Sequence, residues 1–146
     1  MTSVSTKPLP THRLPWSRLG LIALVAMLGA AITNVVVYLL AGAIGVDWSF
    51  VVPQMGAPIP VMAPLMASLI GVGLGMIVFA ALNAFTHEPV RWFTWVALVG
   101  GLFSLGGPLT IPGVPLAVLL TLVLMHIVAV TFVVLTPRRL SAEPRR

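Results

Sequence analysis

Four long runs of this chain contain no charged residue, and this feature restricts the possible folds more than any other. The runs cover about residues 19–44, 61–85, 92–109 and 116–135. A helix rises about 1.5 Å per residue, so about 17–25 apolar residues cross the hydrocarbon core of a bilayer. Each run has a length in or slightly above this range. The sequence therefore predicts four membrane-spanning helices.

The composition agrees with a membrane location. Hydrophobic residues make up 59% of the chain and charged residues only 8%, whereas a soluble domain has about 25% charged residues. Such a chain has too few charges to cover a surface that faces water. We predict an all-α integral membrane protein, folded as a compact antiparallel four-helix bundle because the predicted connections are short.

The first run has a second possible interpretation. Ala41–Gly42–Ala43 has the small-x-small form of a signal-peptide cleavage site. The apolar core of a signal peptide, however, covers about 7–15 residues, and this run is much longer. We therefore predict that residues 19–44 form a membrane span.

The basic residues predict the orientation. They precede the first span, lie between the second and third, or follow the fourth: Lys7, Arg13, Arg18, Arg91, Arg138, Arg139, Arg145 and Arg146. By the positive-inside rule this side is cytoplasmic, so we expect both termini inside the cell and the protein in the plasma membrane. Trp16, Trp92 and Trp95 would lie at the inner interface and Trp48 at the outer one, as in the aromatic belts of membrane proteins.

This topology divides the chain into a basic, proline-rich tail at 1–18, a membrane domain at 19–136 and a basic tail at 137–146. The net charge of +5 flanks the spans and forms no basic stripe. We therefore expect the lipid bilayer as a partner, and no nucleic acid. The chain contains no cysteine, which excludes disulfides and cysteine-ligated metals.

Small residues recur at spacings that bring helices close together in membranes. Six of them are our candidate helix-packing residues: Ala63, Ala67, Gly71, Gly75, Gly100 and Ser104. The first four follow one another at intervals of four, so they lie on one ridge of a helix. We expect this ridge to pack against helices of the same chain. A homodimer contact is the alternative.

Asn34, Tyr38 and His126 form a candidate polar cluster near the membrane midplane. The spans contain no Asp, Glu, Lys or Arg, so we expect a neutral His126 that needs one acceptor and one donor. Asn34 and Tyr38 would supply them across the bundle. Such a cluster fastens helices together, or it binds a ligand or relays protons. Since His12 and His87 would lie at the cytoplasmic side, we expect no metal site and no cofactor.

Enzymatic motifs are weak. Gly101–Gly106 has the spacing G-x-x-S-x-G in place of the nucleophile elbow G-x-S-x-G. A pair of Ser104 and His126 is conceivable in an intramembrane hydrolase, but no acidic residue is available to orient the histidine. We therefore expect no catalytic residues and interpret Ser104 as a packing residue.

Three short segments together resemble a known group of proteins: Ala63–Gly71, Ser104–Pro108 and Leu124–Val128. In this order they are similar to small four-span membrane proteins of actinobacterial type that are grouped as a domain of unknown function. The resemblance covers about residues 19–137. It implies a four-span membrane fold, and it brings no activity or catalytic residues.

The sequence favours a non-enzymatic role in which the protein acts by helix association, as an accessory or scaffold subunit. Its partner would be a second copy or another protein of a membrane complex. The alternative is a small ligand-binding or transport protein with a midplane site at Asn34, Tyr38 and His126. An intramembrane enzyme that uses Ser104 and His126 is a third hypothesis.

Overall fold

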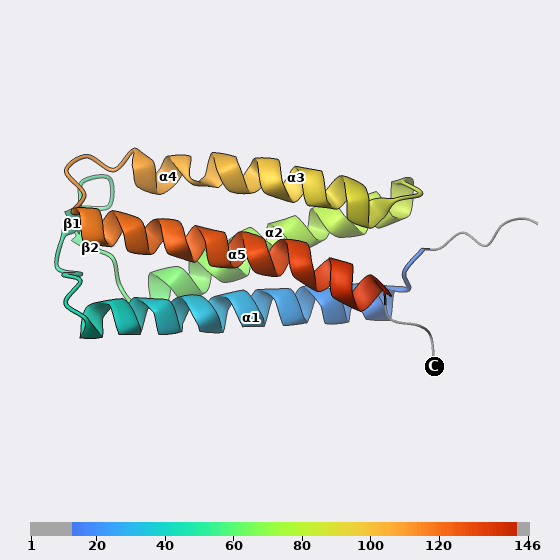
Figure 1. The fold of residues 1–146 in the computed structure, drawn as a ribbon, viewed down its shortest axis with the longest axis horizontal. Coiled ribbons are helices and arrows are strands. Elements are labelled where there is room, and N and C mark those ends of the chain that lie inside the picture. Colours follow the sequence, from blue (N-terminus) through green and yellow to red (C-terminus); the bar gives the residue numbers. More distant parts are fainter. Residues whose placement is uncertain (1–12, 143–146) are drawn as a thin grey trace, which may run out of the picture.

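A computed structural model describes residues 13–142 and is mostly helical (Figure 1). Of the predicted tails at 1–18 and 137–146, residues 1–12 and 143–146 lie outside the described residues. Within 13–142, four helical stretches are long and apolar enough to cross a membrane. They are α1 (Trp16–Ala43), α2 (Met62–Phe85), α3 with its short continuation α4 (Pro89–Ser104 and Gly106–Leu109), and α5 (Leu116–Ala142).

The helices lie side by side along the long axis of the molecule (Figure 1). We call one end the hairpin end, because it holds the connection between α1 and α2 and the turn between α4 and α5. The opposite, terminal end holds the start of α1, the turn between α2 and α3, and the end of α5. α2 packs against α1 along its length. It lies near α3 only at the terminal end, so α2 and α3 diverge towards the hairpin end (Figure 1).

Two helix boundaries differ from the predicted spans. The third span is interrupted at Leu105, because Pro108 has no N–H to donate to the carbonyl of Ser104 and two glycines precede it. The fourth helix continues through Pro137 to Ala142, although its span was predicted to end near 135. Arg139 in its last turn lies where a positive charge interacts favourably with the helix dipole.

The predicted loop between the first two spans contains a small hairpin. β1 (Val51–Val52) pairs with β2 (Ala57–Pro58) in antiparallel register, with Val51 opposite Pro58. Gly56 lies just before β2 with φ of 62°, a backbone conformation that glycine adopts at little cost. The hairpin gives the hairpin end of the molecule a defined shape.

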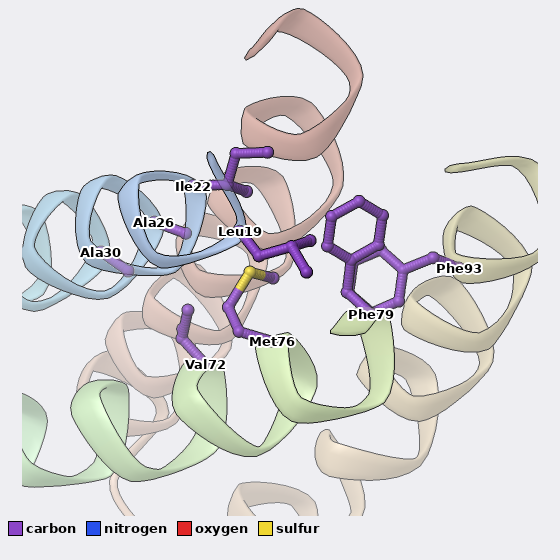
Figure 2. Close-up of a cluster of buried hydrophobic side chains, with 8 residues drawn as sticks. All are labelled: Leu19, Ile22, Ala26, Ala30, Val72, Met76, Phe79 and Phe93. Carbon is purple, nitrogen blue, oxygen red and sulfur yellow. The ribbon is translucent and has the colours of Figure 1, made fainter. Parts of the chain in front are cut away.

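A cluster of buried side chains joins α1, α2 and α3 (Figure 2). Its members are Leu19, Ile22, Ala26, Ala30, Val72, Met76, Phe79 and Phe93. Its two alanines, Ala26 and Ala30, are fully buried, because small side chains let the helices approach closely. The rings of Phe79 and Phe93 lie 5.0 Å apart in a tilted arrangement, and they fill the space between α2 and α3 towards the terminal end.

The side chain of Asn83 ties the end of α2 to the segment that precedes α1. Its Oδ1 accepts a hydrogen bond from the N–H of Leu14 at 3.0 Å, and its Nδ2 donates to the carbonyl of Leu14 at 3.2 Å. This amide therefore satisfies both main-chain polar groups of Leu14. It fixes the position at which the chain enters α1.

Neighbouring glycines in α3 have opposite surroundings. A Cβ added at Gly101 would overlap the side chain of Val130 in α5, whereas one added at Gly100 meets nothing within 4 Å. Gly101 therefore allows α3 and α5 to pack closely. Val130 is β-branched, so it has one strongly preferred rotamer in a helix and little freedom to move aside.

We predict that Gly101→Ala lowers the free energy of unfolding by about 1–3 kcal/mol, the usual cost of overpacking. The matched control, Gly100→Ala, should leave it unchanged or raise it by up to about 1 kcal/mol, because alanine is the better helix former. Thermal unfolding in mild detergent, followed by circular dichroism, measures both. Equal stabilities of the two variants would contradict the close contact between α3 and α5.

Candidate functional site

Asn34 joins three helices through one side chain. It is only 3% exposed, and its Nδ2 donates to Ser68 Oγ in α2 at 2.9 Å and to the carbonyl of Met125 in α5 at 3.1 Å. The sequence predicted a hydrogen bond between Asn34 and the side chain of His126, and this bond is not present in the structure. The partner in α5 is the main-chain oxygen of the preceding residue.

The other polar atom of this side chain has no partner. Asn34 Oδ1 is buried and makes no hydrogen bond within the described chain. An unsatisfied buried acceptor typically costs about 1–3 kcal/mol. Retention of this atom in the interior is unusual, because most buried polar side-chain atoms have at least one partner.

His126 interacts with its own helix. Its Nδ1 lies 2.8 Å from the carbonyl oxygen of Leu122, one turn earlier. Since a carbonyl only accepts, Nδ1 carries the hydrogen, and in the neutral ring Nε2 is then an acceptor. Nε2 has no hydrogen-bond partner among residues 13–142. The expected role of His126 as a fastener between helices is therefore not observed.

Tyr38 binds the loop of the hairpin end to α1. Its hydroxyl donates to the carbonyl of Ile59 at 2.8 Å, and its ring stacks on Trp48 with centroids 4.2 Å apart. Trp48 Nε1 in turn donates to the carbonyl of Tyr38 at 3.3 Å. The expected bond from Tyr38 to His126 is replaced by these contacts, so this residue shapes the wall at the hairpin end.

Asn34, Tyr38 and His126 nevertheless border the same space. A cavity of about 500 Å³ lies between α1, α2, α3 and α5, and these three residues and Ser68 are among those that line it. None of the described lining residues is Asp, Glu, Lys or Arg. The site is therefore an uncharged cavity with a few polar groups on an otherwise apolar wall.

The candidate helix-packing residues also line this cavity: Ala63, Ala67, Gly71, Gly75, Gly100 and Ser104. A Cβ added at Gly71 or Gly100 would meet nothing within 4 Å, while one at Gly75 would be 3.6 Å from Val133 in α5. The expectation of close packing within the chain is thus not met at Gly71 and Gly100. The reason is that α2 and α3 diverge, and small residues on facing helices then leave a space.

Exposed residues on the cavity wall show where it opens. Leu74 of α2 is 60% exposed and Val96 of α3 is 46% exposed, and both line the cavity. The opening therefore lies between α2 and α3. Tyr38 and Ile59 bound the cavity towards the hairpin end, and Phe93 bounds it towards the terminal end.

The structure shows no hydrogen bond between Ser104 and His126 in the part of the chain that it describes. The hydroxyl of Ser104 donates to the carbonyl of Gly101 at 2.7 Å. The same described range also contains no group of three His, Cys, Asp or Glu residues that could hold a metal ion.

Ser68 is the polar contact that sequence reasoning did not include in the site. It lies close to the same depth as Asn34 when residues are counted from the hairpin end of each helix. Depth matching would have identified it. The carbonyl of Met125 belongs to the main chain, so residue types gave no signal for it.

Comparison with known proteins gives one match. The profile of a family of unknown function (DUF6069) matches residues 15–143. No curated protein and no solved structure matches the chain significantly.

We predict that Asn34→Ala destabilises the bundle more than His126→Ala does. Asn34 makes two bonds between helices, and such bonds contribute about 0.6–2 kcal/mol in membranes. The bond of His126 lies within one helix, so its loss separates no helices. Unfolding midpoints in one detergent measure both variants, and a larger loss for His126→Ala would contradict this assignment.

Proposed function

The chain belongs to a family of unknown function (DUF6069), and from that premise we propose that it binds a small, mainly apolar molecule inside the membrane. The proposal goes beyond the general statement that this is a membrane protein with four apolar helices. One observation carries it. The chain leaves a cavity of about 500 Å³ between its helices and places unpaired polar groups beside it.

The size and character of the cavity support this role. Small-molecule sites usually occupy about 300–1,000 Å³ and combine apolar walls with a few oriented polar groups. The described lining is uncharged, and proton-coupled transporters generally use an intramembrane carboxylate. We therefore propose binding, without catalysis and without proton coupling.

A second candidate function is helix association, as an accessory or scaffold subunit. It is favoured by Gly71 and Gly100, which are exposed and have open space beside them. A helix of a second copy, or of another membrane protein, would then occupy the space between α2 and α3. The same opening serves both candidates, so one experiment can separate them.

We also propose that the bundle is antiparallel, lies in the plasma membrane and turns its terminal end to the cytoplasm. Arg13 precedes α1, Arg91 begins α3, and Arg138 and Arg139 end α5, so these charges share the terminal end (Figure 1). Asp47 lies in the connection at the hairpin end. The positive-inside rule supports this orientation.

We expect a hexadecane probe with a mid-chain diazirine to label the cavity walls of α2 and α3 in proteoliposomes. Gly100→Leu should lower this labelling at least about fivefold, the effect of roughly 1 kcal/mol of lost binding, because the leucine side chain enters the cavity. Mass spectrometry of the labelled peptides gives the yield relative to the exposed face of α1, at Leu21, Leu24 and Leu28.

Gly20→Leu is the matched control for that experiment. A Cβ at Gly20 also meets nothing within 4 Å, but this residue does not line the cavity. Its labelling should equal that of the wild type. Labelling of α2 and α3 that stays at the level of α1 in all three proteins would contradict ligand binding, and loss of a crosslinked dimer in Gly100→Leu would favour helix association.

The orientation has a direct test, because the chain lacks cysteine. We expect Gln54→Cys, at the hairpin end, to react with a membrane-impermeant maleimide added to intact cells. His87→Cys, in the turn at the terminal end, should react only after the cells are opened. Both positions are exposed. The reverse pattern would overturn the proposed orientation.

A further inference from the structure

We propose that the cavity selects a guest with a neutral head group that donates a hydrogen bond, such as a hydroxyl on a long hydrocarbon chain. This inference rests on the proposed function, since it names the class of molecule that the site takes. On the polar wall of the cavity, the side-chain donors are engaged in hydrogen bonds within the protein, whereas some acceptors are free.

The polar side chains on the cavity wall have their donors engaged within the protein. These bonds run from Asn34 Nδ2 to Ser68 Oγ and Met125 O, from Ser68 Oγ to Pro64 O, from the Tyr38 hydroxyl to Ile59 O, from His126 Nδ1 to Leu122 O, and from Ser104 Oγ to Gly101 O. Both hydrogens of the Asn34 amide are therefore in use. A guest that only accepts hydrogen bonds finds none of these donors free.

Acceptors remain free on the same wall, and the hydroxyl oxygens of Tyr38 and Ser104, which accept no bond from residues 13–142, are among them. Asn34 Oδ1 is buried without a partner, and Nε2 of a neutral His126 has a lone pair and no partner among the described residues. His126 is partly exposed and lines the cavity, so its Nε2 is an accessible acceptor, and an imidazole nitrogen accepts more strongly than a hydroxyl oxygen such as that of Ser104. A guest hydroxyl loses its hydrogen bonds to water when it enters an apolar space. A bond donated to His126 Nε2 compensates for this loss.

A buried acceptor is costly when it stays unpaired, so Asn34 Oδ1 adds a second reason for a donor at this place. Asn34 Oδ1 has almost no exposed surface, so His126 Nε2 is the acceptor that a guest reaches first. Charged heads are disfavoured, because an ion in an apolar surrounding needs a counter-charge and the described lining offers none.

The rest of the cavity suits a hydrocarbon chain. From His126 to Val133, both of which line it, α5 rises about 10 Å at 1.5 Å per residue. Along this length the opposite wall is formed by Gly71, Gly75 and Ala97, whose side chains leave room. We therefore place the head group of the guest at His126 and its hydrocarbon chain along the apolar wall towards Phe93.

Competition against the diazirine probe tests this inference with the full-length protein in proteoliposomes. Hexadecanol, hexadecyl methyl ether and hexadecanoate are added at equal content. We expect hexadecanol to displace the probe about five- to tenfold better than the ether, as the gain of one hydrogen bond implies. The ether has the same chain and no donor. Hexadecanoate should be the weakest competitor.

His126→Phe keeps a ring of similar size and removes the Nε2 acceptor. We expect this variant to lose the preference for hexadecanol over the ether, measured as the ratio of their competition constants, whatever its own affinity for the probe. The control is Thr131→Val, on the same helix, because Thr131 donates to the carbonyl of Ile127 and does not line the cavity. Its preference should equal that of the wild type.

The possible outcomes separate the two proposals. If the probe does not label α2 and α3 above the level of α1, the proposed function is contradicted, and so is this inference. If the alcohol and the ether compete equally, or hexadecanoate competes best, the head-group inference is overturned while binding stands. A preference for hexadecanol that persists in His126→Phe also overturns it, because the acceptor would then lie elsewhere.

Discussion

The Asn34 amide is the interaction on which the arrangement of the helices depends. In a membrane, helices gain little from apolar burial, because lipid tails are as apolar as leucine. Polar contacts between helices therefore set how they align. Asn34 holds α1 against α2 and α5 at one level, and the contact of Leu14 with Asn83 and that of Tyr38 with Ile59 hold the two ends. The bonds that fix the bundle also consume the donors of the site.

The positions of the helices could be predicted because charge is so costly in lipid that its absence marks a span. Their ends were harder to predict, because local chemistry sets them. Pro108 interrupts the third span, whereas Pro137 lies inside α5. The same residue type thus has opposite effects, and the difference lies in its surroundings. Both prolines are buried, but two glycines directly precede Pro108, whereas the residues before Pro137 in α5 include no glycine.

The three polar residues singled out from the sequence line one cavity, but the hydrogen bonds expected between them are absent. Asn34, Tyr38 and His126 do share one cavity, since depth along a span can be counted from the sequence. The acceptor of His126 is a carbonyl of its own helix, and no residue spacing reveals that choice. Gly71 and Gly100 look like packing residues, yet they border a space. Whether facing small residues meet depends on the helix angle, which the bulk of Phe79 and Phe93 helps to set.

The position of the opening has a consequence for how a guest would reach the site. Tyr38, stacked on Trp48 and bonded to Ile59, bounds the cavity towards the hairpin end, while the exposed wall residues lie between α2 and α3. A guest would then arrive by lateral diffusion within one plane. Occupancy would follow its mole fraction among the surrounding lipids, and its solubility in water would not limit the encounter. Because the bilayer already concentrates an apolar molecule, a weak affinity, expressed per mole fraction in the lipid, is sufficient to occupy the site.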